Sequence, residues 1–196
     1  MLRILIADDH TIVRRGLKQI LTEEFSNAVI DEVPDAEELI KKVMSEKWDV
    51  VVSDLSMPGR SGLDALQQIK SSFPDLPVLI LSIHPEEQYA LRALKSGASG
   101  YLSKDTAPDE LVKAVQTVLL GKKYISAAVA EKLASNISSN SQKQAHELLS
   151  DREFDVMKLL ANGKSVSDIA EMLSLSVTTV STYRARVMAK MNLKSN

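Results

Sequence analysis

Residues Trp48–Gly59 read WDVVVSDLSMPG, and the fold of the chain follows from this stretch. The run Val50–Val52 is short, apolar and β-branched, which predicts a strand that is buried on both faces. Asp54 comes directly after it, and the following Pro58–Gly59 predicts a turn. A carboxylate at the carboxyl end of a buried strand lies where open α/β sheets bind ligands. Taken alone, Asp54 could also be a helix N-cap or an ordinary loop aspartate, so its role depends on the rest of the chain.

Strand-like apolar runs alternate with segments of helical period up to residue 121. The expected strands are Leu2–Ala7, Ala28–Val33, Val50–Ser53, Val78–Ser82 and Gly100–Ser103. The expected helices are Thr11–Glu23 (with Ile12, Leu17, Ile20 and Leu21 on one side), Asp35–Ser45, Gly62–Phe73, Pro85–Ser96 and Pro108–Leu120. This alternation predicts an α/β fold, a flavodoxin-like doubly wound sheet of five parallel strands in the order 2-1-3-4-5.

Length and composition limit the classes of protein that the chain can belong to. With 196 residues, of which 44% are hydrophobic and 26% charged, it can form two domains with packed cores. The absence of cysteine excludes disulfide scaffolds, thiolate metal sites and cysteine nucleophiles. The N-terminal apolar run is too short for a signal peptide, and no later run reaches transmembrane length. We therefore expect a cytoplasmic protein that does not act at a membrane.

The formal net charge of −2 is unevenly distributed along the chain. Residues 1–125 carry 15 Lys and Arg against 19 Asp and Glu, whereas residues 126–196 carry 9 against 7. No acidic residue follows Glu171. A basic tail behind an acidic front weakly favours an anionic partner for the tail.

The composition changes after Tyr124, where a second, helical region is expected. A short helix is predicted over Ala127–Ala134, and Ser135–Gln144 consists almost entirely of Ser, Asn, Gln and Lys, which predicts an interdomain linker. Three helices are expected after it: one opened by the capping box Ser150–Glu153, one over about Ser167–Leu173 and one over Val177–Met191. The tight turn between the last two is typical of a helix-turn-helix unit.

Four of the predicted strands end in polar residues, namely Asp8 and Asp9, Asp54, Ser82 and Lys104. Because the carboxyl ends of parallel strands meet at one edge of a sheet, we expect these groups to converge. Close carboxylates repel one another unless a cation neutralises them, and hard divalent ions such as Mg²⁺ prefer oxygen ligands. A carboxylate can also attack phosphorus to form an aspartyl phosphate, whose formation a metal and a lysine would stabilise. In isolation, Asp8 and Asp9 could cap a helix and Lys104 could be solvated, so the prediction depends on the whole set.

The three histidines, His10, His84 and His146, are scattered and lack metal-ligand spacing, so we expect none of them to bind a metal.

Residues 1–121 resemble the receiver domain of two-component response regulators. The motifs that carry the resemblance are Ile-Ala-Asp8-Asp9-His10, Asp54-Leu-Ser-Met-Pro-Gly, Leu-Ser82 and Gly-Tyr101-Leu-Ser-Lys104.

The resemblance implies a role for each of these residues. Asp54 would be the phosphoacceptor, and Asp9 a direct ligand of Mg²⁺ (or Mn²⁺). Asp8 would bind the metal through water, and the backbone carbonyl of Ser56 would complete the protein ligands. Lys104 would contact the phosphoryl group. Ser82 and Tyr101 would form the switch pair, the hydroxyl moving toward the phosphate and the ring turning inward.

The segment Val177–Met191 has the features of a DNA-reading helix. Its apolar residues Val180, Val187 and Met191 share one side, and the other sides are polar or basic. Base contacts in the major groove are expected from Thr178, Thr179, Ser181, Thr182, Ala185 and Arg186. Phosphate contacts are expected from Arg184, Arg186, Lys190 and Lys194. From charge alone, a solvated helix face explains the segment as well.

Residues 148–196 also resemble the LuxR/FixJ-type DNA-binding domain, through Leu-Ser-Asp-Arg-Glu153, Gly163-Lys-Ser, Asp168-Ile-Ala and Thr179-Val180. The whole chain therefore resembles a NarL/FixJ-type transcriptional response regulator. The expected domains are a receiver over 1–122, a linker over 123–147 and a helix-turn-helix domain over 148–196, which is expected to lack the family's last helix.

The resemblance implies a transcriptional regulator that binds double-stranded DNA. It would be switched by Mg²⁺-dependent phosphorylation of Asp54 by a sensor histidine kinase, and it would form a homodimer on phosphorylation. Such a regulator catalyses only its own phosphoryl transfer and dephosphorylation. One alternative is a phosphatase with an aspartyl nucleophile, although Ser56 stands where such an enzyme needs a second acid. Another is a signalling adaptor that binds proteins without reading DNA, which the basic tail argues against.

Overall fold

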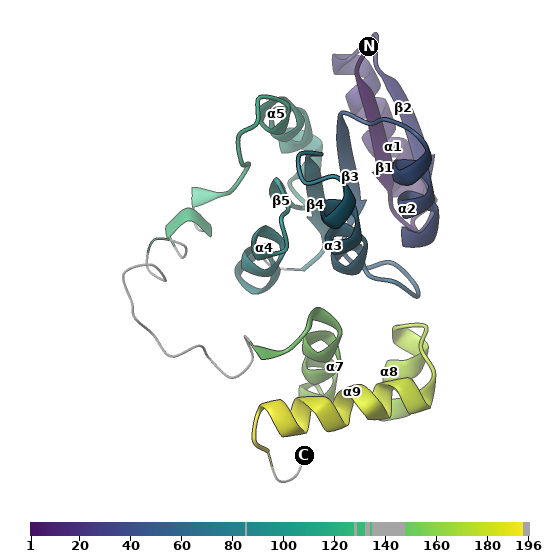
Figure 1. Ribbon diagram of the computed structural model, residues 1–196, viewed down its shortest axis with the longest axis vertical. Coiled ribbons are helices and arrows are strands. Elements are labelled where there is room, and N and C mark those ends of the chain that lie inside the picture. The colour runs from purple at the N-terminus through teal and green to yellow at the C-terminus, as the bar shows by residue number, and fades with distance from the viewer. Residues whose placement is uncertain (85, 128, 132–133, 135–147, 194–196) are drawn as a thin grey trace. The chain divides into compact units, whose positions relative to one another are not determined.

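A computed structural model describes residues 1–84, 86–127, 129–131, 134 and 148–193 of the chain (Figure 1). The chain divides into two compact units, Met1–Ser135 and Asn136–Asn196. The first contains a sheet with helices on both faces, and the second is helical.

The sheet of the first unit has five parallel strands in the order β2-β1-β3-β4-β5. They are β1 (Arg3–Ala7), β2 (Val29–Val33), β3 (Val50–Asp54), β4 (Val78–Ser82) and β5 (Gly100–Ser103). In β3 and β4 every residue is buried, as the β-branched and aliphatic runs predict for central strands covered on both faces. The predicted fold class and strand order are therefore confirmed, and Asp54 itself forms the last position of its strand.

Five helices connect and cover the strands. They are α1 (Thr11–Glu24), α2 (Ala36–Ser45), α3 (Gly62–Ser72), α4 (Glu86–Lys95) and α5 (Ala107–Leu119). Asp35 caps α2 by accepting a hydrogen bond from the Glu38 N–H, and Ser61 and Asp64 form a capping box at the start of α3. The helical period of α1 predicts that Ile12 lies on the same side as Leu17 and Leu21. This prediction is wrong for Ile12, which is 84% exposed while Leu17 and Leu21 are buried.

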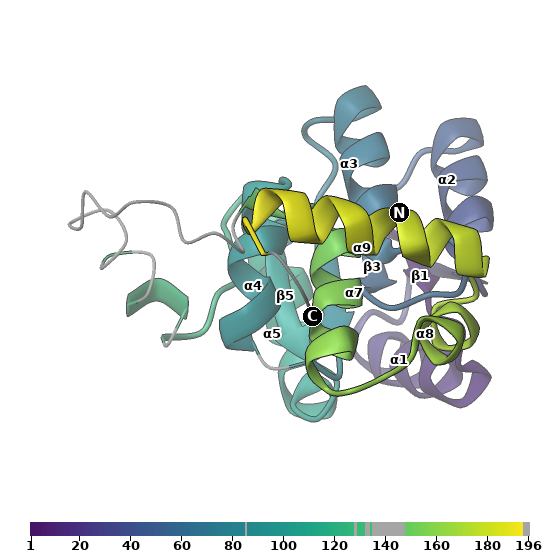
Figure 2. The same ribbon diagram turned by 90° about the horizontal axis from the view of Figure 1, so that it is seen from below.

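The two faces of the sheet are covered by different helices, which Figure 2 shows as separate layers. Alternate strand residues such as Ile4, Ile6, Val50 and Val52 share one core with buried residues of α1 and α5. The intervening residues point to the opposite face, on the side of α2 and α3. A doubly wound sheet of this kind leaves its carboxyl edge free of helices, so that edge can hold a site.

The chain returns to the edge strand β5 after α5. Tyr124 forms a parallel bridge with Gly100, and the Tyr124 N–H donates to the Ser99 carbonyl at 2.9 Å. A Cβ on Gly100 would lie 2.6 Å from the Tyr124 carbonyl oxygen, so only glycine allows this close approach. The described residues of the expected helix Ala127–Ala134 are helical, whereas the expected linker Ser135–Gln144 lies outside the described residues.

The second unit contains α7 (Asp151–Ala161), α8 (Val166–Met172) and α9 (Val177–Lys190). Ser150 and Ser165 each open a helix with a capping box, and Ser176 caps α9 by accepting from the Thr179 N–H. The core is small and consists of Val156, Ile169, Ala170 and Val180, with partly buried residues packed around it. Between α8 and α9 the turn passes through a left-handed residue, Ser174, which reverses the chain within a few residues.

Candidate functional site

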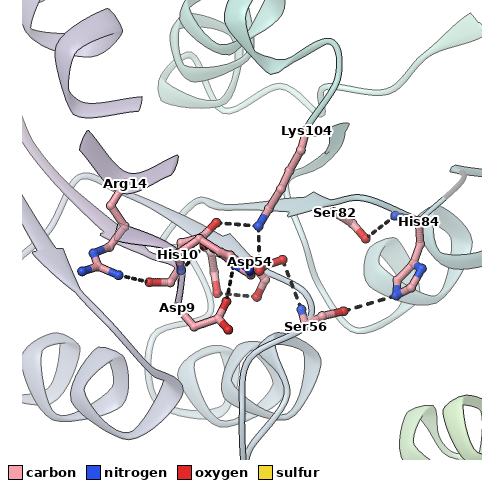
Figure 3. A network of polar contacts seen from close by, with 10 residues as sticks. Asp9, His10, Arg14, Asp54, Ser56, Ser82, His84 and Lys104 are labelled. Atoms are coloured by element: carbon pink, nitrogen blue, oxygen red, sulfur yellow. Dashed lines mark hydrogen bonds and ion pairs between the residues drawn. The ribbon is translucent and has the colours of Figure 1, made fainter. Parts of the chain in front are cut away.

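The carboxyl edge of the sheet brings together the acidic residues and the lysine that the sequence singled out (Figure 3). Asp8 and Asp9 follow β1, Asp54 ends β3, and Lys104 follows β5. Lys104 Nζ lies 2.8 Å from Asp54 Oδ2, to which it donates a hydrogen bond, and 2.7 Å from Asp8 Oδ2. The contact with Asp8 is an ion pair. Two buried carboxylates thus share one ammonium group.

Burial and charge act in opposite directions on the protonation of this cluster. Burial raises the pKa of Asp54, and the negative charge of Asp8 raises it further, while Lys104 and the Ser56 N–H oppose the rise. For Lys104, burial alone would lower the pKa, but its contacts with Asp54 and Asp8 outweigh burial and raise it. The lysine therefore stays charged, and the Asp54 carboxylate carries a desolvation cost that an additional cation would reduce.

The acidic residues also fit a divalent cation. Asp8, Asp9, His10 and Asp54 each offer one ligand atom, and these atoms all lie within 4.8 Å of one another. Among the described residues, none donates a hydrogen bond to the buried Oδ1 of Asp9. A buried carboxylate oxygen without a donor, beside two further carboxylates, is suited to a hard cation such as Mg²⁺.

His10 is the neighbour of this cluster that the sequence did not identify. Spacing argued against a metal role for the histidines, yet His10 Nδ1 lies 2.8 Å from Asp9 Oδ1. The available signal was adjacency, because His10 directly follows the two aspartates and is the N-cap residue of α1.

Ser56, Ser82 and Tyr101 meet around the loop that follows β4. Ser82 Oγ is buried and accepts a hydrogen bond from the His84 N–H at 2.9 Å, so the hydroxyl is engaged with this loop. The hydroxyl of the buried Tyr101 donates to the His84 carbonyl, also at 2.9 Å. The His84 ring stacks on Tyr89, and its Nε2 lies 3.3 Å from Ser56 Oγ. His84, which had no assigned role, thus contacts every one of these predicted residues.

Gly62 fixes the distance between α3 and Asp54. A Cβ at this position would lie 1.9 Å from the Asp54 carbonyl oxygen and 3.1 Å from the Leu55 Cα. The Gly62 N–H donates to the Leu55 carbonyl at 2.9 Å, which holds the start of α3 against the end of β3. The absence of a side chain is therefore required directly beneath the candidate phosphoacceptor.

In the second unit, α9 has the two-sided character that its sequence predicts. Val180 and Val187 are buried. The exposed or partly exposed residues include all the predicted base contacts, namely Thr178, Thr179, Ser181, Thr182, Ala185 and Arg186. Arg184 is partly exposed on the same helix. The N-terminal half of α9 thus presents a polar surface without acidic residues.

Lys190 occupies a position that the sequence did not predict. Its Nζ lies 2.6 Å from Glu153 Oε2, which connects the end of α9 to the start of α7. Burial would raise the pKa of Glu153, but the hydrogen bonds from Lys190 and Ser150 outweigh it and lower the pKa. Lys190 is therefore engaged within the unit, while Lys194, the other predicted phosphate contact near this end, lies outside the described residues.

Two family models match the chain, and together they cover most of it. Residues 4–116 match the response regulator receiver domain. Residues 147–196 match the bacterial regulatory proteins of the luxR family. The chain belongs to the NarL/FixJ family of response regulators.

Known relatives match this response regulator over nearly its whole length. The oxygen regulatory protein NreC of Staphylococcus carnosus is 39% identical over 201 residues, which cover 99% of this chain and 93% of that protein. The response regulator UvrY of Escherichia coli K12 is 36% identical, over 98% of this chain and 89% of that protein. Among solved structures, RcsB of Salmonella enterica serovar Typhimurium, bound to promoter rprA in the presence of the phosphomimetic BeF3-, has a TM-score of 0.66 at 28% identity, over 100% of this chain and 94% of that chain.

Family membership settles the coarse function. The protein is a two-component response regulator with a LuxR-type DNA-binding domain, and such regulators are not conventional enzymes, so the phosphatase alternative has no support. The cluster of Asp8, Asp9 and Asp54 is typical of the magnesium site of receiver domains. Among the described residues, no helix has the length and apolar character needed to cross a bilayer.

Proposed function

We propose that this response regulator accepts a phosphoryl group on Asp54 from a sensor histidine kinase, and that phosphorylation controls its dimerisation and its binding to double-stranded DNA. The observation that carries the proposal is the pairing of Asp54 with Lys104. Asp54 is 3% exposed at a strand end, and its Oδ2 accepts a hydrogen bond from the Lys104 ammonium at 2.8 Å. A nucleophile and a cation for the developing charge are thus held in contact before the donor arrives.

The transfer requires little of the protein beyond position and charge. An oxygen of the Asp54 carboxylate attacks the phosphorus of a phosphohistidine, the new O–P bond forms, and the P–N bond breaks with its electron pair on the departing imidazole nitrogen. Lys104, which already lies between Asp8 and Asp54, then faces the oxygens of the phosphoryl group. Ser56 donates its N–H to Asp54 Oδ1 at 3.2 Å and thereby orients the carboxylate for attack.

The metal would be held by Asp9 and Asp54, by Asp8 through water, and by the backbone carbonyl of Ser56. A bound Mg²⁺ (or Mn²⁺) supplies positive charge that neutralises the acidic cluster and the phosphoryl oxygens. The position of Asp8 supports this assignment. Its side chain is fully buried, and Lys104 is the only cationic side chain of the described residues that lies within 3 Å of its carboxylate.

The switch would act through the loop after β4. Ser82 and Tyr101 hold the backbone of His84 from opposite sides, one at its N–H and the other at its carbonyl. If the Ser82 hydroxyl turns toward a phosphoryl group on Asp54, the His84 N–H loses its acceptor and the Tyr101 contact must adjust. Phosphorylation then biases two arrangements of this loop, by as much as the phosphoryl group's differential affinity for them.

DNA binding is assigned to α9, within the domain expected over 148–196. The luxR-family match and the structure of RcsB bound to promoter DNA support this assignment. Residues near the N-terminal end of α9 would contact base edges, with Arg184 and Arg186 on phosphates, while Lys190 pairs with Glu153. A structure of two RcsB dimers bound to two DNAs supports a homodimeric binding state.

Phosphorylation is tested by incubating the full chain with radiolabelled acetyl phosphate and Mg²⁺. We expect a hydroxylamine-sensitive label on the wild type and none on Asp54→Asn. The matched control is Asp105→Asn, which removes an exposed carboxylate next to Lys104 and should leave the labelling intact. A label that persists on Asp54→Asn would show that another residue is the acceptor.

DNA binding is tested by footprinting genomic fragments with and without acetyl phosphate. Arg184→Ala combined with Arg186→Ala should weaken binding and reduce the slope of log K against log salt by about 2, one unit for each phosphate group that the variant no longer neutralises. Arg15→Ala, an exposed arginine of α1, is the control and should leave the slope unchanged. Unchanged binding by the double variant would exclude the proposed reading of the groove by α9.

A further inference from the structure

His10 lies beside the acidic cluster in an orientation that its helix position does not require. It is the N-cap residue of α1, yet its side chain makes no capping hydrogen bond. Its backbone N–H donates to Asp8 Oδ1 at 2.8 Å, which fixes the residue over the cluster. The ring nitrogen Nδ1 lies 2.8 Å from Asp9 Oδ1 and 3.3 Å from Asp8 Oδ1.

The approach of His10 to Asp9 is as short as a hydrogen bond but is not one. The Asp9 Oδ1 atom is buried and accepts no hydrogen bond from any residue that the structure describes. An imidazole nitrogen and a carboxylate oxygen 2.8 Å apart, with no hydrogen bond between them, have the spacing of two adjacent ligands of one octahedral ion, whose metal–ligand distances of about 2.1 Å put neighbouring donors about 3 Å apart. A cation that both atoms face would therefore bind to both.

We propose that His10 Nδ1 is a ligand of the divalent cation held by Asp8, Asp9 and Asp54, and that this nitrogen shifts the site's preference from Mg²⁺ toward later divalent ions such as Ni²⁺. The inference rests on the metal site of the proposed function and adds a donor to it. All four side chains already offer ligand atoms within 4.8 Å of one another.

The chemistry of the donor set gives the direction of the preference. Mg²⁺ favours oxygen ligands in an octahedral site and gains little from imidazole, whereas imidazole suits Ni²⁺ and other later divalent ions. Replacing a water on the metal by His10 therefore strengthens the binding of Ni²⁺ more than that of Mg²⁺. The ring is well placed for this exchange because its side chain is 63% exposed and borders solvent.

The competing explanation is that His10 is an imidazolium that pairs with the two aspartates. The two explanations predict different changes in the affinity for divalent ions when the ring is removed. A positively charged ring would repel an incoming cation, so its removal would strengthen the binding of every divalent ion. If the ring is a neutral ligand, its removal would leave Mg²⁺ binding nearly unchanged and would weaken Ni²⁺ binding.

The test measures metal affinity and metal coordination in the full chain, at about pH 8, where an unperturbed imidazole is neutral. Calorimetric titrations with Mg²⁺, Mn²⁺ and Ni²⁺ compare the wild type with His10→Gln. We expect His10→Gln to weaken Ni²⁺ binding by about tenfold or more, a loss that even an outer-shell partner of a metal site can cause. Its Mg²⁺ affinity should stay within about twofold, because imidazole contributes little to that ion.

Pulsed EPR on the Mn²⁺ complex supplies the second readout. The wild type should show the ¹⁴N coupling of a bound imidazole, His10→Gln should lose it, and His84→Gln should keep it. Loss of the coupling in His84→Gln, or stronger Mg²⁺ binding by His10→Gln, would overturn the proposal. If Mn²⁺ binds without nitrogen coupling, only the ligand role of His10 fails, and if no divalent ion binds the wild type, the metal site of the proposed function fails as well. Labelling the wild type with ¹⁵N tests the coupling without any variant.

Discussion

Replacing Gly62 by alanine should destabilise the receiver unit and disturb the candidate phosphoacceptor at once. The new Cβ would lie 1.9 Å from the Asp54 carbonyl oxygen, whereas real Cβ atoms essentially never approach a neighbour closer than 3.0 Å. The atoms it meets belong to the backbone of Asp54 and Leu55, so no flexible side chain can move aside. The start of α3 must therefore move away from β3 by more than 1 Å, which weakens the Gly62–Leu55 hydrogen bond and the packing behind it.

The free energy of unfolding should fall by about 3 kcal/mol, at the upper end of the cost of overpacking a tight site. Urea denaturation of the full chain, followed by circular dichroism, measures it. Gly16→Ala is the matched control, because a Cβ at this position in α1 meets nothing within 4 Å. Gly16→Ala should be stabilising by up to about 1 kcal/mol, through the gain in helix propensity. If both substitutions change the stability by the same amount, the steric argument for Gly62 is wrong.

Two further predictions concern the charged groups with shifted pKa values. Glu153→Gln should destabilise the helical unit by about 2 kcal/mol at pH 7, because it replaces the carboxylate of a capping box and an ion-pair partner of Lys190. The folded pKa of Glu153 is lowered, so its contribution to the stability of the unit is present above the unfolded pKa of about 4.3 and is lost as the pH falls through the folded value. If Glu153→Gln remains less stable than the wild type to urea at acid pH, this reasoning is wrong. Asp54→Asn should stabilise the receiver unit at pH 7 without divalent ions, because burial raises the pKa of the Asp54 carboxyl. The contribution of this carboxyl to stability is present below the unfolded pKa of about 3.9 and is lost as the pH rises through the folded value. The advantage of the variant should therefore disappear in acid, and lower stability of Asp54→Asn at pH 7 would show that the Lys104 contact dominates.

The sheet and its polar edge could be predicted from the sequence because both follow from the chain's local pattern. The run Val50–Val52 identifies a central strand, and the alternation with helices determines a parallel sheet. In a parallel sheet the carboxyl ends of the strands meet at one edge, so the convergence of Asp9, Asp54 and Lys104 follows from the strand topology alone. Their pairing distances then depend on side-chain conformation, which sequence patterns do not specify.

The features that sequence patterns do not reveal depend on tertiary contacts or on where the core ends along a helix. Helical period placed Ile12 with the apolar residues of α1, but period does not say where along a helix the core ends, and Ile12 lies in the first turn. The pair Lys190–Glu153 joins residues 37 positions apart, so charge alone suggested a free phosphate contact for the lysine. His10 has no spacing signal because its proximity to Asp9 comes from the cap of α1 rather than from a repeat.

The return of the chain to β5 has a consequence for self-association. An edge strand exposes unpaired backbone groups, which can add a strand from another molecule and start aggregation. Here Tyr124 occupies the amino end of that edge, with its N–H on the Ser99 carbonyl and the Lys123 ammonium on the Ala98 carbonyl. The same residues that lead out of the receiver unit thus shorten the strand edge open to a foreign chain, and the missing side chain of Gly100 is what allows them to lie there.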